Sequence, residues 1–369
     1  MEVHATDPER QNIMASLDLA DIRTIVVTGG AGFVGSHLVD DLLAACPDAR
    51  VRVLDAFTYA ASMSNLDTAF STGRVTLHQG DVGNLDLVTD IVRDADLIVH
   101  AAAESHVERS FSVPERFSLA NAIGTQVLVE AMARRKVPLM IHVGTAEVYG
   151  TPEGVVDEAA PMMPDNPLAA SKAAAEMLIA GLRQTYGLDI RVVRPVNLFG
   201  TRQNAEKLLP RYLELAAVGR GLPVHGDGLQ RRSYLSIIDL CSAVRAVIAR
   251  GAPNAAYNVS GPENYSVLDV ARLVLDAVPD PVAGVSFMNG RPKNVSRAPV
   301  STRAIEALGW RPRISLASEL PALAQWYTSR IPRTALRRVL TEVPTLAPRN
   351  VQAVTQSAGS GLFRSLERH

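Results

Sequence analysis

One segment constrains the fold of this chain more than any other: residues 24–43, with the sequence TIVVTGGAGFVGSHLVDDLL. A short β-branched run leads into a glycine loop, and apolar residues at helical spacing follow. Gly29, Gly32 and Gly35 lie three residues apart, and their missing Cβ atoms permit a tight turn and close approach of a pyrophosphate to the backbone. The segment therefore predicts a strand, a turn and a helix whose N-terminus can bind an anion.

An acidic residue beyond this loop indicates which dinucleotide such a site would take. Asp55 comes twenty residues after Gly35 and directly after a second apolar run. A carboxylate at this point accepts hydrogen bonds from the adenosine ribose hydroxyls and repels a 2′-phosphate. We therefore expect NAD rather than NADP. The alternative is a glycine-rich turn that has no ligand.

The composition argues against several other classes of protein. The chain has 369 residues, 47% of them hydrophobic, and a net charge of −1. It is long enough for about two domains and has no charge surplus that would attract nucleic acid or an anionic membrane. We find no apolar run of the roughly 18 residues that span a membrane, no signal peptide and no metal-ligand spacing. Cys46 and Cys241 are expected to be reduced core residues of a cytoplasmic protein.

Beyond Asp55 the chain alternates between strand-like and helix-like segments. The expected strands span residues 75–78, 97–103, 139–143 and 190–194, and the expected helices span residues 85–93, 119–136 and 168–186. Strands separated by helices imply right-handed crossovers and a mostly parallel sheet. The sequence thus predicts an α/β fold with a Rossmann-type doubly wound parallel sheet. Ligands bind at the carboxyl ends of such strands, so the loops that follow them should surround one site.

Four regions are expected along the chain. Residues 1–20 are a loose extension, and residues 21–196 form the NAD-binding Rossmann domain. Proline and glycine become frequent beyond residue 196, which indicates a smaller C-terminal substrate-binding domain over residues 197–330. Within it, residues 234–259 are expected to rejoin the main sheet. Residues 331–369 are expected to be a tail without chemistry.

Several further motifs occur in order between Thr24 and Trp326. They are LDAFTYAASMSNL, GDV, AAAESHVERSF, HVGTAEVYG, PLAASKAAAE, RQNAEKLLP, GLPVHGDGLQRRSYL, YNVSG, GRPKNVSR and LGWRP. With the glycine loop, they make the chain resemble the extended short-chain dehydrogenase/reductases that act on nucleotide sugars, and most closely the dTDP-glucose 4,6-dehydratase group. AESHV and EKLLP point to the dehydratase branch, whereas RPVNLFG looks more like the epimerase and decarboxylase branches.

The resemblance implies a reaction in which NAD is reduced and reoxidised on the same sugar, in the biosynthesis of modified sugars or secondary metabolites. In this family the sugar is oxidised at C4, a base removes the C5 proton, water leaves C6 and the hydride returns to C6. The tyrosine of a Tyr-x-x-x-Lys motif takes the C4 hydroxyl proton, and the lysine holds the nicotinamide ribose. A Ser/Thr-Asp-Glu triplet supplies a hydroxyl at C4, the acid for C6 and the base for C5.

The chain departs from this pattern at two catalytic positions. Leu168 stands at the tyrosine position and Ala146 at the aspartate position, whereas Thr145, Glu147 and Lys172 are retained. Leucine and alanine cannot transfer protons, and loss of a positioned acid or base lowers the rate by roughly 10²–10⁴. We therefore expect the standard 4,6-dehydration to be slow or absent unless another group substitutes.

Three interpretations compete, and we favour the first. In the first, the chain is an active NAD enzyme with altered chemistry, in which Glu147 deprotonates C5 of a 4-keto sugar, epimerisation or a different elimination follows, and His106, Tyr149 or a bound water serves as a substitute base. In the second, it is an ordinary 4,6-dehydratase in which residues that the sequence does not identify replace the lost groups. In the third, it is a pseudoenzyme that binds NAD or a nucleotide sugar for regulation or scaffolding.

The resemblance also implies ligand-binding residues, although each has a plainer alternative as a surface charge, a helix cap or a packed side chain. The residues expected to contact NAD are Gly29, Gly32, Phe33, Val34, Gly35, Asp55, Asp81, Val82, Ala102 and Lys172. Those expected to contact a nucleotide-diphosphate sugar are Ser105, Asn197, Glu206, Lys207, Leu208, Val224, His225, Arg232, Asn258 and Arg291. Among the latter, Lys207, Arg232 and Arg291 suit a diphosphate clamp because they donate hydrogen bonds to phosphate oxygens.

The helices expected at 119–136 and 168–186 carry apolar residues at helical spacing. In related proteins such helices pair across a two-fold axis into a four-helix bundle, so we expect a homodimer. Core packing within one chain would explain the same pattern.

Overall fold

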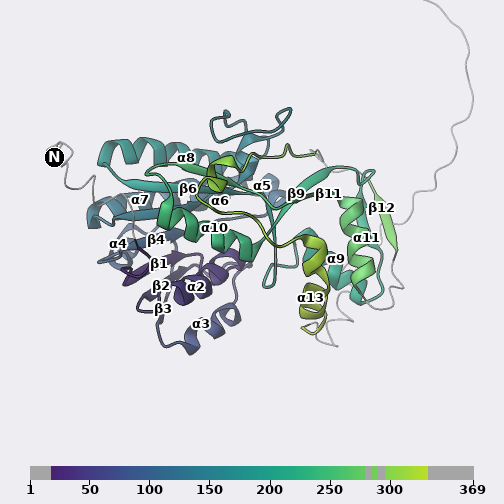
Figure 1. Cartoon of the computed structure of the whole chain (residues 1–369), viewed down its shortest axis with the longest axis horizontal. Coiled ribbons are helices and arrows are strands. Elements are labelled where there is room, and N and C mark those ends of the chain that lie inside the picture. The colour runs from purple at the N-terminus through teal and green to yellow at the C-terminus, as the bar shows by residue number, and fades with distance from the viewer. Residues whose placement is uncertain (1–17, 279–283, 290–295, 331–369) are drawn as a thin grey trace, which may run out of the picture. The chain divides into compact units, whose positions relative to one another are not determined.

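The computed structural model describes residues 18–278, 284–289 and 296–330, which belong to one compact unit ending at Arg330 (Figure 1). Most of the expected N-terminal extension and the whole expected tail lie outside the described residues, as does Arg291. Within the described part of the chain, no helix is both long enough and apolar enough to cross a bilayer.

A seven-stranded parallel sheet lies at the centre, in the order β10-β6-β5-β4-β1-β2-β3. Its strands are β1 (Thr24–Thr28), β2 (Arg50–Asp55), β3 (Val75–Gln79), β4 (Leu97–His100), β5 (Leu139–Val143), β6 (Asp189–Pro195) and β10 (Ala256–Val259). The strand order reverses at β1, which pairs with β2 on one side and β4 on the other. The Rossmann-type prediction is confirmed, and this switch point is where ligands bind in such sheets.

Helices cover both faces of the sheet (Figure 1). On one face, α2 (Phe33–Ala45) packs against α10 (Ile237–Arg250). On the other face lie α4 (Leu85–Ile91), α7 (Gly124–Arg135) and α8 (Pro167–Tyr186). Successive side chains of a strand point to opposite faces, so Ile25 and Val27 join the core under α2 and Val26 joins the core under α7.

Local sequence sets the ends of α8. The Asn166 side chain accepts a hydrogen bond from the backbone N–H of Ala169, Pro167 occupies the first turn, and Gly187 ends the helix in the left-handed conformation. The helix expected at 119–136 differs from the prediction, because a π-helical turn (η2, Ser118–Ile123) precedes α7. The shorter elements of this half are η1 (Met63–Leu66), α3 (Asp67–Ser71), α5 (Val107–Ser112), α6 (Pro114–Phe117) and η3 (Ala146–Tyr149).

The C-terminal part adds two small sheets. One contains β7 (Asn197–Phe199), β9 (Arg231–Ser236) and β11 (Glu263–Ser266), and the other contains β8 (Leu222–His225) and β12 (Val285–Met288). Its helices are α9 (Leu208–Ala217), α11 (Val267–Ala277), α12 (Arg303–Glu306) and α13 (Leu316–Thr328). The segment 234–259 is divided: β9 belongs to the three-stranded sheet, whereas α10 packs on the main sheet and β10 pairs with β6.

Candidate active site

A cavity of about 420 Å³ lies where the loops after β1, β4, β5 and β6 meet the C-terminal part of the chain. The predicted residues that line it are Phe33, Val34, Ser105, Thr145, Glu147, Lys172, Asn197, Glu206, Lys207, Leu208, His225 and Arg232. Further lining residues, which no sequence motif indicated as ligand contacts, include Glu104, Gln203, Arg211, Gln230 and Tyr234. Two of these had a signal in the sequence, because Glu104 precedes Ser105 behind an apolar strand and Arg211 follows Lys207 by one helical turn.

The glycine loop lies directly against the loop after β4. Gly29 has φ +69°, and a Cβ atom there would come within 2.7 Å of the Ala102 backbone. A Cβ on Gly35 would lie 2.1 Å from the Gly29 carbonyl oxygen. Gly32 precedes α2, and no side chain in the described part of the chain caps that helix. Its first N–H groups thus stay available to an anion, so the loop fits a pyrophosphate.

Asp55 braces this loop from the end of β2. Its carboxylate accepts hydrogen bonds from the backbone N–H groups of Ala31 at 2.9 Å and Phe57 at 2.8 Å. Burial raises the pKa of Asp55, and these two donors oppose the shift. Asp81 and Val82 follow the neighbouring strand β3, where Asp81 accepts a hydrogen bond from Gly83. These acidic residues lie at the sheet edge beyond the cavity lining, where the adenosine half of a dinucleotide would reach.

Lys172 and Leu168 share one face of α8 at the cavity wall, one helical turn apart. The Lys172 ammonium donates a hydrogen bond of 2.7 Å to the Val143 carbonyl, and the side chain is buried. Burial lowers the pKa of Lys172 to about 8, although the carboxylate of Glu176 opposes the shift. Leu168 puts an aliphatic surface where the family pattern has a phenol, so this position holds no proton-transferring group.

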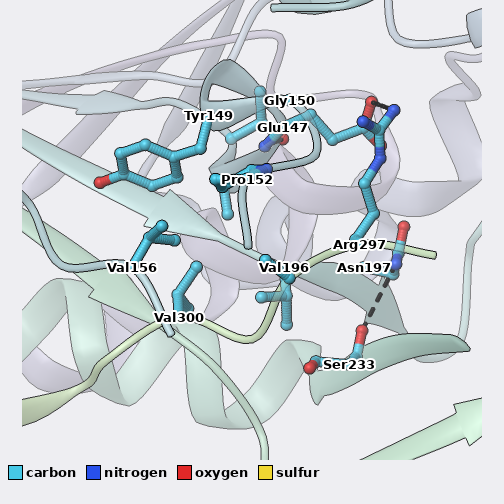
Figure 2. Close-up of a pocket in the computed structure, with 13 residues that line it drawn as sticks. Glu147, Tyr149, Gly150, Pro152, Val156, Val196, Asn197, Ser233, Arg297 and Val300 are labelled. Carbon is cyan, nitrogen blue, oxygen red and sulfur yellow. Dashed lines mark hydrogen bonds and ion pairs between the residues drawn. The ribbon is translucent and has the colours of Figure 1, made fainter. Parts of the chain in front are cut away.

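Glu147 lies at the junction of the main cavity and a second cavity of about 60 Å³ (Figure 2). It belongs to the short helix η3, where the Thr145 hydroxyl accepts a hydrogen bond from the Glu147 backbone. Its carboxylate lies 3.7 Å from the Arg297 guanidinium and 3.5 Å from the Asn166 amide nitrogen. Ala146 lines the smaller cavity beside it. The arrangement presents one carboxylate to a ligand, but no acid at position 146.

Tyr149 is not placed to replace the missing groups. Arg194 donates a hydrogen bond of 2.6 Å to its hydroxyl, which in turn donates to the Asn258 side chain at 2.8 Å. Burial raises the pKa of Tyr149. Figure 2 shows its hydroxyl pointing away from the Glu147 carboxylate. Asn258, which we expected at the substrate, is fully buried behind the site and holds this tyrosine instead.

The other expected substitute, His106, lies next to expected substrate residues that line the cavity, namely Ser105, Glu206 and Lys207. His106 caps α5, and its Nε2 lies 3.6 Å from the carboxylate of Glu206. Arg109 also pairs with Glu206, and Lys207 donates a hydrogen bond to the Ser105 carbonyl. His106 is not among the residues that line the cavity, and its ring lies against Glu206, which does line it.

Two of the three residues expected to clamp a diphosphate can be located, because Arg291 lies outside the described residues. Lys207 and Arg232 line the same cavity, and burial lowers the pKa of each. His225 lines the cavity beside them, whereas Val224 is fully buried in β8. Within the described residues we find no cluster of three His, Cys, Asp or Glu side chains that could hold a metal ion.

Comparison with known proteins places this geometry in a family. The profile of the NAD dependent epimerase/dehydratase family matches residues 25–260. The chain belongs to this family. Its fold, with the glycine loop at the switch point and Lys172 and Glu147 in one cavity, is the fold of dehydratases and epimerases that use NAD.

Three similar proteins illustrate the relationship. The dTDP-glucose 4,6-dehydratase of Streptomyces niveus is 37% identical over 82% of this chain and 92% of its own length. A crystal structure of dTDP-glucose 4,6-dehydratase from Streptomyces venezuelae with NAD bound is 35% identical, with a TM-score of 0.79 over 84% of this chain and 98% of that one. A trifunctional UDP-glucose 4,6-dehydratase, epimerase and reductase of Arabidopsis thaliana is 37% identical over 83% of this chain, which spans only 47% of that protein.

Proposed function

We propose that this protein binds NAD and a nucleotide-diphosphate sugar, and that Glu147 deprotonates the sugar at C5 while the standard 4,6-dehydration is slow or absent. One observation carries the proposal. The retained residues Thr145, Glu147 and Lys172 line one cavity, whereas the two other positions of the family's catalytic set hold Leu168 and Ala146. This combination supports proton abstraction and does not support departure of water from C6.

NAD is part of the proposal because the residues of the site suit each part of this cofactor. The glycine loop and the uncapped start of α2 suit the pyrophosphate, Asp55 suits the adenosine ribose, and Lys172 suits the nicotinamide ribose. When bound, NAD would supply oxidation of the sugar at C4, which acidifies the C5 hydrogen. Because Leu168 cannot take the C4 hydroxyl proton, a bound water would accept it, and the hydride would return to C4 after C5 is reprotonated. A 4-keto sugar would need neither step.

The chain's own groups would then act on the C5 proton. Glu147 would accept it, and the negative charge that develops on the C4 oxygen would be stabilised by the ammonium of Lys172 and the hydroxyl of Thr145. Return of a proton to the opposite face of C5 would give epimerisation, whereas return to the same face would give exchange alone. Protonation of the C6 oxygen would need an acid, and Ala146 offers none.

A second candidate is an ordinary 4,6-dehydratase. It is favoured by the 37% identity to the Streptomyces niveus enzyme over most of both chains. It requires a substitute acid and a substitute base. The described residues of the main cavity include two other carboxylic acids, Glu104 and Glu206, of which Glu206 is already paired with Arg109.

The deciding experiment is incubation with NAD and a panel of nucleotide sugars, including 4-keto sugars, in deuterated water. We expect deuterium at C5 without mass loss of water, and a rate roughly 10²–10⁴ lower in Glu147→Gln. Rapid loss of water would support the ordinary dehydratase instead. Tight sugar binding without deuterium exchange at C5 would contradict both candidate enzymatic activities. It would indicate that the protein binds a nucleotide sugar without converting it.

A further inference from the structure

The two replaced catalytic positions share one property. Leu168 and Ala146 each put an aliphatic side chain where the family pattern has a proton-transferring group. Leu168 is buried and lines the main cavity, and Ala146 lines the smaller cavity beside Glu147. In the proposed function these two positions face C4 and C6 of the sugar, whereas Glu147 faces C5. The site therefore keeps a base for C5 and offers apolar surface to the carbon on either side of it.

Ala146 belongs to an apolar wall of the smaller cavity. Together with Val196 it packs against a buried hydrophobic cluster that includes Val156 and Val300. Val156 and Val300 are also joined by an isolated β-bridge, which fixes the two side chains beside each other. Figure 2 shows the three valines on the side of the cavity away from the Arg297 guanidinium. A C6 substituent beside Ala146 would therefore meet methyl groups.

Polar side chains on the other side of the smaller cavity already have partners. The Arg297 guanidinium lies 2.7 Å from the Asp165 carboxylate. The amide nitrogen of Asn197 donates a hydrogen bond of 3.4 Å to the Ser233 carbonyl, and the Ser233 hydroxyl bonds the side chain of Asn264 at 3.2 Å. A C6 hydroxyl would have to compete for these groups, and a buried hydroxyl without a partner weakens binding. A methyl group needs no partner.

The charges of the site also favour an uncharged group at C6. Lys207 and Arg232 add positive charge, but both line the main cavity and neither lines the smaller one. There they suit the diphosphate, which is negatively charged. In the smaller cavity the carboxylates of Asp165 and Glu147 offset the charge of Arg297. An anionic substituent would therefore find no unpaired cation among the described residues that line the smaller cavity.

Leu168 gives the matching information about C4. A C4 hydroxyl loses its proton when the sugar is oxidised, and the Leu168 side chain cannot accept that proton. A C4 ketone carries no such proton. The ammonium of Lys172, one turn further along α8, and the hydroxyl of Thr145 line the same cavity and suit a negative charge on the C4 oxygen. A sugar already oxidised at C4 thus does not need the group that Leu168 replaces.

We infer that the substrate is a nucleotide-linked 4-keto-6-deoxyhexose, whose C6 methyl group packs against Ala146 and the three valines. This one substrate accounts for both replaced positions, because it needs neither oxidation at C4 nor protonation of a C6 oxygen. The inference rests on the proposed function, because it uses the positions that the proposal gives to C4, C5 and C6.

The reaction on this substrate is a proton exchange at C5. Glu147 takes the C5 proton, and the electron pair of the broken C–H bond forms a double bond between C4 and C5, with the negative charge on the C4 oxygen. A proton from water then returns to the opposite face of C5, and the enolate becomes a ketone again. Glu147 releases its proton to solvent. The sugar is epimerised, and nothing is oxidised or reduced.

The chemistry of the substrate also places the protein in a reaction sequence. A 4-keto-6-deoxyhexose forms when a nucleotide hexose is oxidised at C4 and loses the C6 oxygen as water. A separate 4,6-dehydration must therefore supply the substrate. The product keeps its 4-ketone, so a reaction that consumes a ketone, such as a reduction, follows.

The first test compares two ligands that differ only in the C6 hydroxyl. Calorimetric titration of the full chain with NAD uses glucose and 6-deoxyglucose, each linked to dTDP and, separately, to UDP. We expect the 6-deoxy sugar to bind at least about tenfold more tightly with whichever nucleotide is accepted. Ala146→Ser supplies a hydroxyl beside C6 and should remove most of this preference. Ala307→Ser, at an exposed position outside both cavities, is the matched control and should keep it.

The second test follows the C5 hydrogen in deuterated water. Deuterium should enter C5 of the 4-keto-6-deoxy sugar at least about a hundredfold faster than C5 of the corresponding glucose, because the missing base at C4 costs roughly 10²–10⁴ in rate. The absorbance of NADH should not rise during this exchange. Glu147→Gln should slow the exchange toward the rate without protein.

Each outcome decides between the two proposals. Equal binding of glucose and 6-deoxyglucose, or equal exchange on glucose and the 4-keto-6-deoxy sugar, would overturn the substrate assignment and leave the proposed function intact. A binding preference that survives Ala146→Ser would also overturn it, because C6 would then lie elsewhere. If no sugar exchanges its C5 hydrogen, the proposed function fails and the substrate assignment fails with it.

Discussion

Arg194 on β6 and Glu176 on α8 form a buried ion pair behind the site, with 2.6 Å between Nη2 of the arginine and Oε2 of the glutamate. Their side chains are 6% and 3% exposed. Arg194 also donates to the Tyr149 hydroxyl, and Glu176 follows Lys172 by one helical turn. The pair therefore joins α8, with its lysine, to the strand beneath it, and holds Tyr149 outside the lining of the main cavity.

Breaking this pair should destabilise the protein strongly. In Glu176→Gln, the Arg194 guanidinium stays buried without its counter-charge, which lowers the free energy of unfolding by about 3–5 kcal/mol. Urea unfolding followed by circular dichroism measures the change. Asp48→Asn removes one partner of the exposed Arg23–Asp48 pair and should change stability by less than about 1 kcal/mol. Equal stability of Glu176→Gln and wild type would show that the pair does not hold α8 in place.

The low pKa of Lys172 predicts a pH-dependent affinity for NAD. Lys172 is charged below its folded pKa of about 8 and loses its proton as the pH rises through that value. A neutral amine is a weaker partner for the ribose hydroxyls and the nearby phosphates, so NAD affinity should be highest below pH 8 and fall above it. Fluorescence titration between pH 6.5 and pH 9.5 measures the profile.

Two variants test whether Lys172 causes this slope. Lys172→Met should bind NAD more weakly at pH 7 and show no decrease through pH 8. Lys172→Arg should keep a cation over the whole range and also give a flat profile, because arginine does not lose its proton there. A decrease of the same size in Lys172→Met would assign the titration to another group.

The sequence was informative wherever local rules determine structure. The strand expected at 139–143 is β5, and the helix expected at 168–186 is α8 apart from one residue, because Asn166, Pro167 and Gly187 mark its ends. The site residues that could be placed from the sequence follow buried strands directly, as Thr145 and Glu147 follow β5. Their position depends on the parallel sheet alone, which the alternation of strands and helices predicts.

The features that could not be predicted depend on contacts between distant segments. The π-helical turn contains Asn121, whose amide hydrogen-bonds the Glu104 backbone and the Ser171 hydroxyl. No local pattern in the sequence identifies those partners. Asn258 was likewise assigned from its motif, and only the packing of β10 against β6 shows that its side chain faces Tyr149. The smaller cavity beside Glu147 is likewise lined in part by Ala298 and Val300, which lie far along the chain.

Restoring the missing catalytic groups should restore the missing chemistry. Leu168→Tyr places a phenol one turn before Lys172, and Ala146→Asp places an acid beside Glu147. Because each lost acid or base lowers the rate by roughly 10²–10⁴, the double variant should dehydrate a matching nucleotide hexose at least about a hundredfold faster than wild type. Mass spectrometry of the product, which lacks one water, measures the gain. Each single variant should gain less, and no gain in the double variant would contradict the assignment of these two positions.

An exposed apolar surface predicts that two copies of the chain associate. Leu119 and Ile123 on η2 and Met177 on the adjacent helix α8 are 61%, 45% and 60% exposed. Apolar side chains gathered on neighbouring helices are typical of a homodimer interface. We expect a dimer by sedimentation velocity at micromolar concentration, and monomers for the Leu119→Glu and Met177→Glu double variant. Leu229→Glu, at a 62% exposed leucine between β8 and β9, should remain dimeric. A monomeric wild type would assign these side chains to another role, and dissociation by Leu229→Glu would place the interface elsewhere.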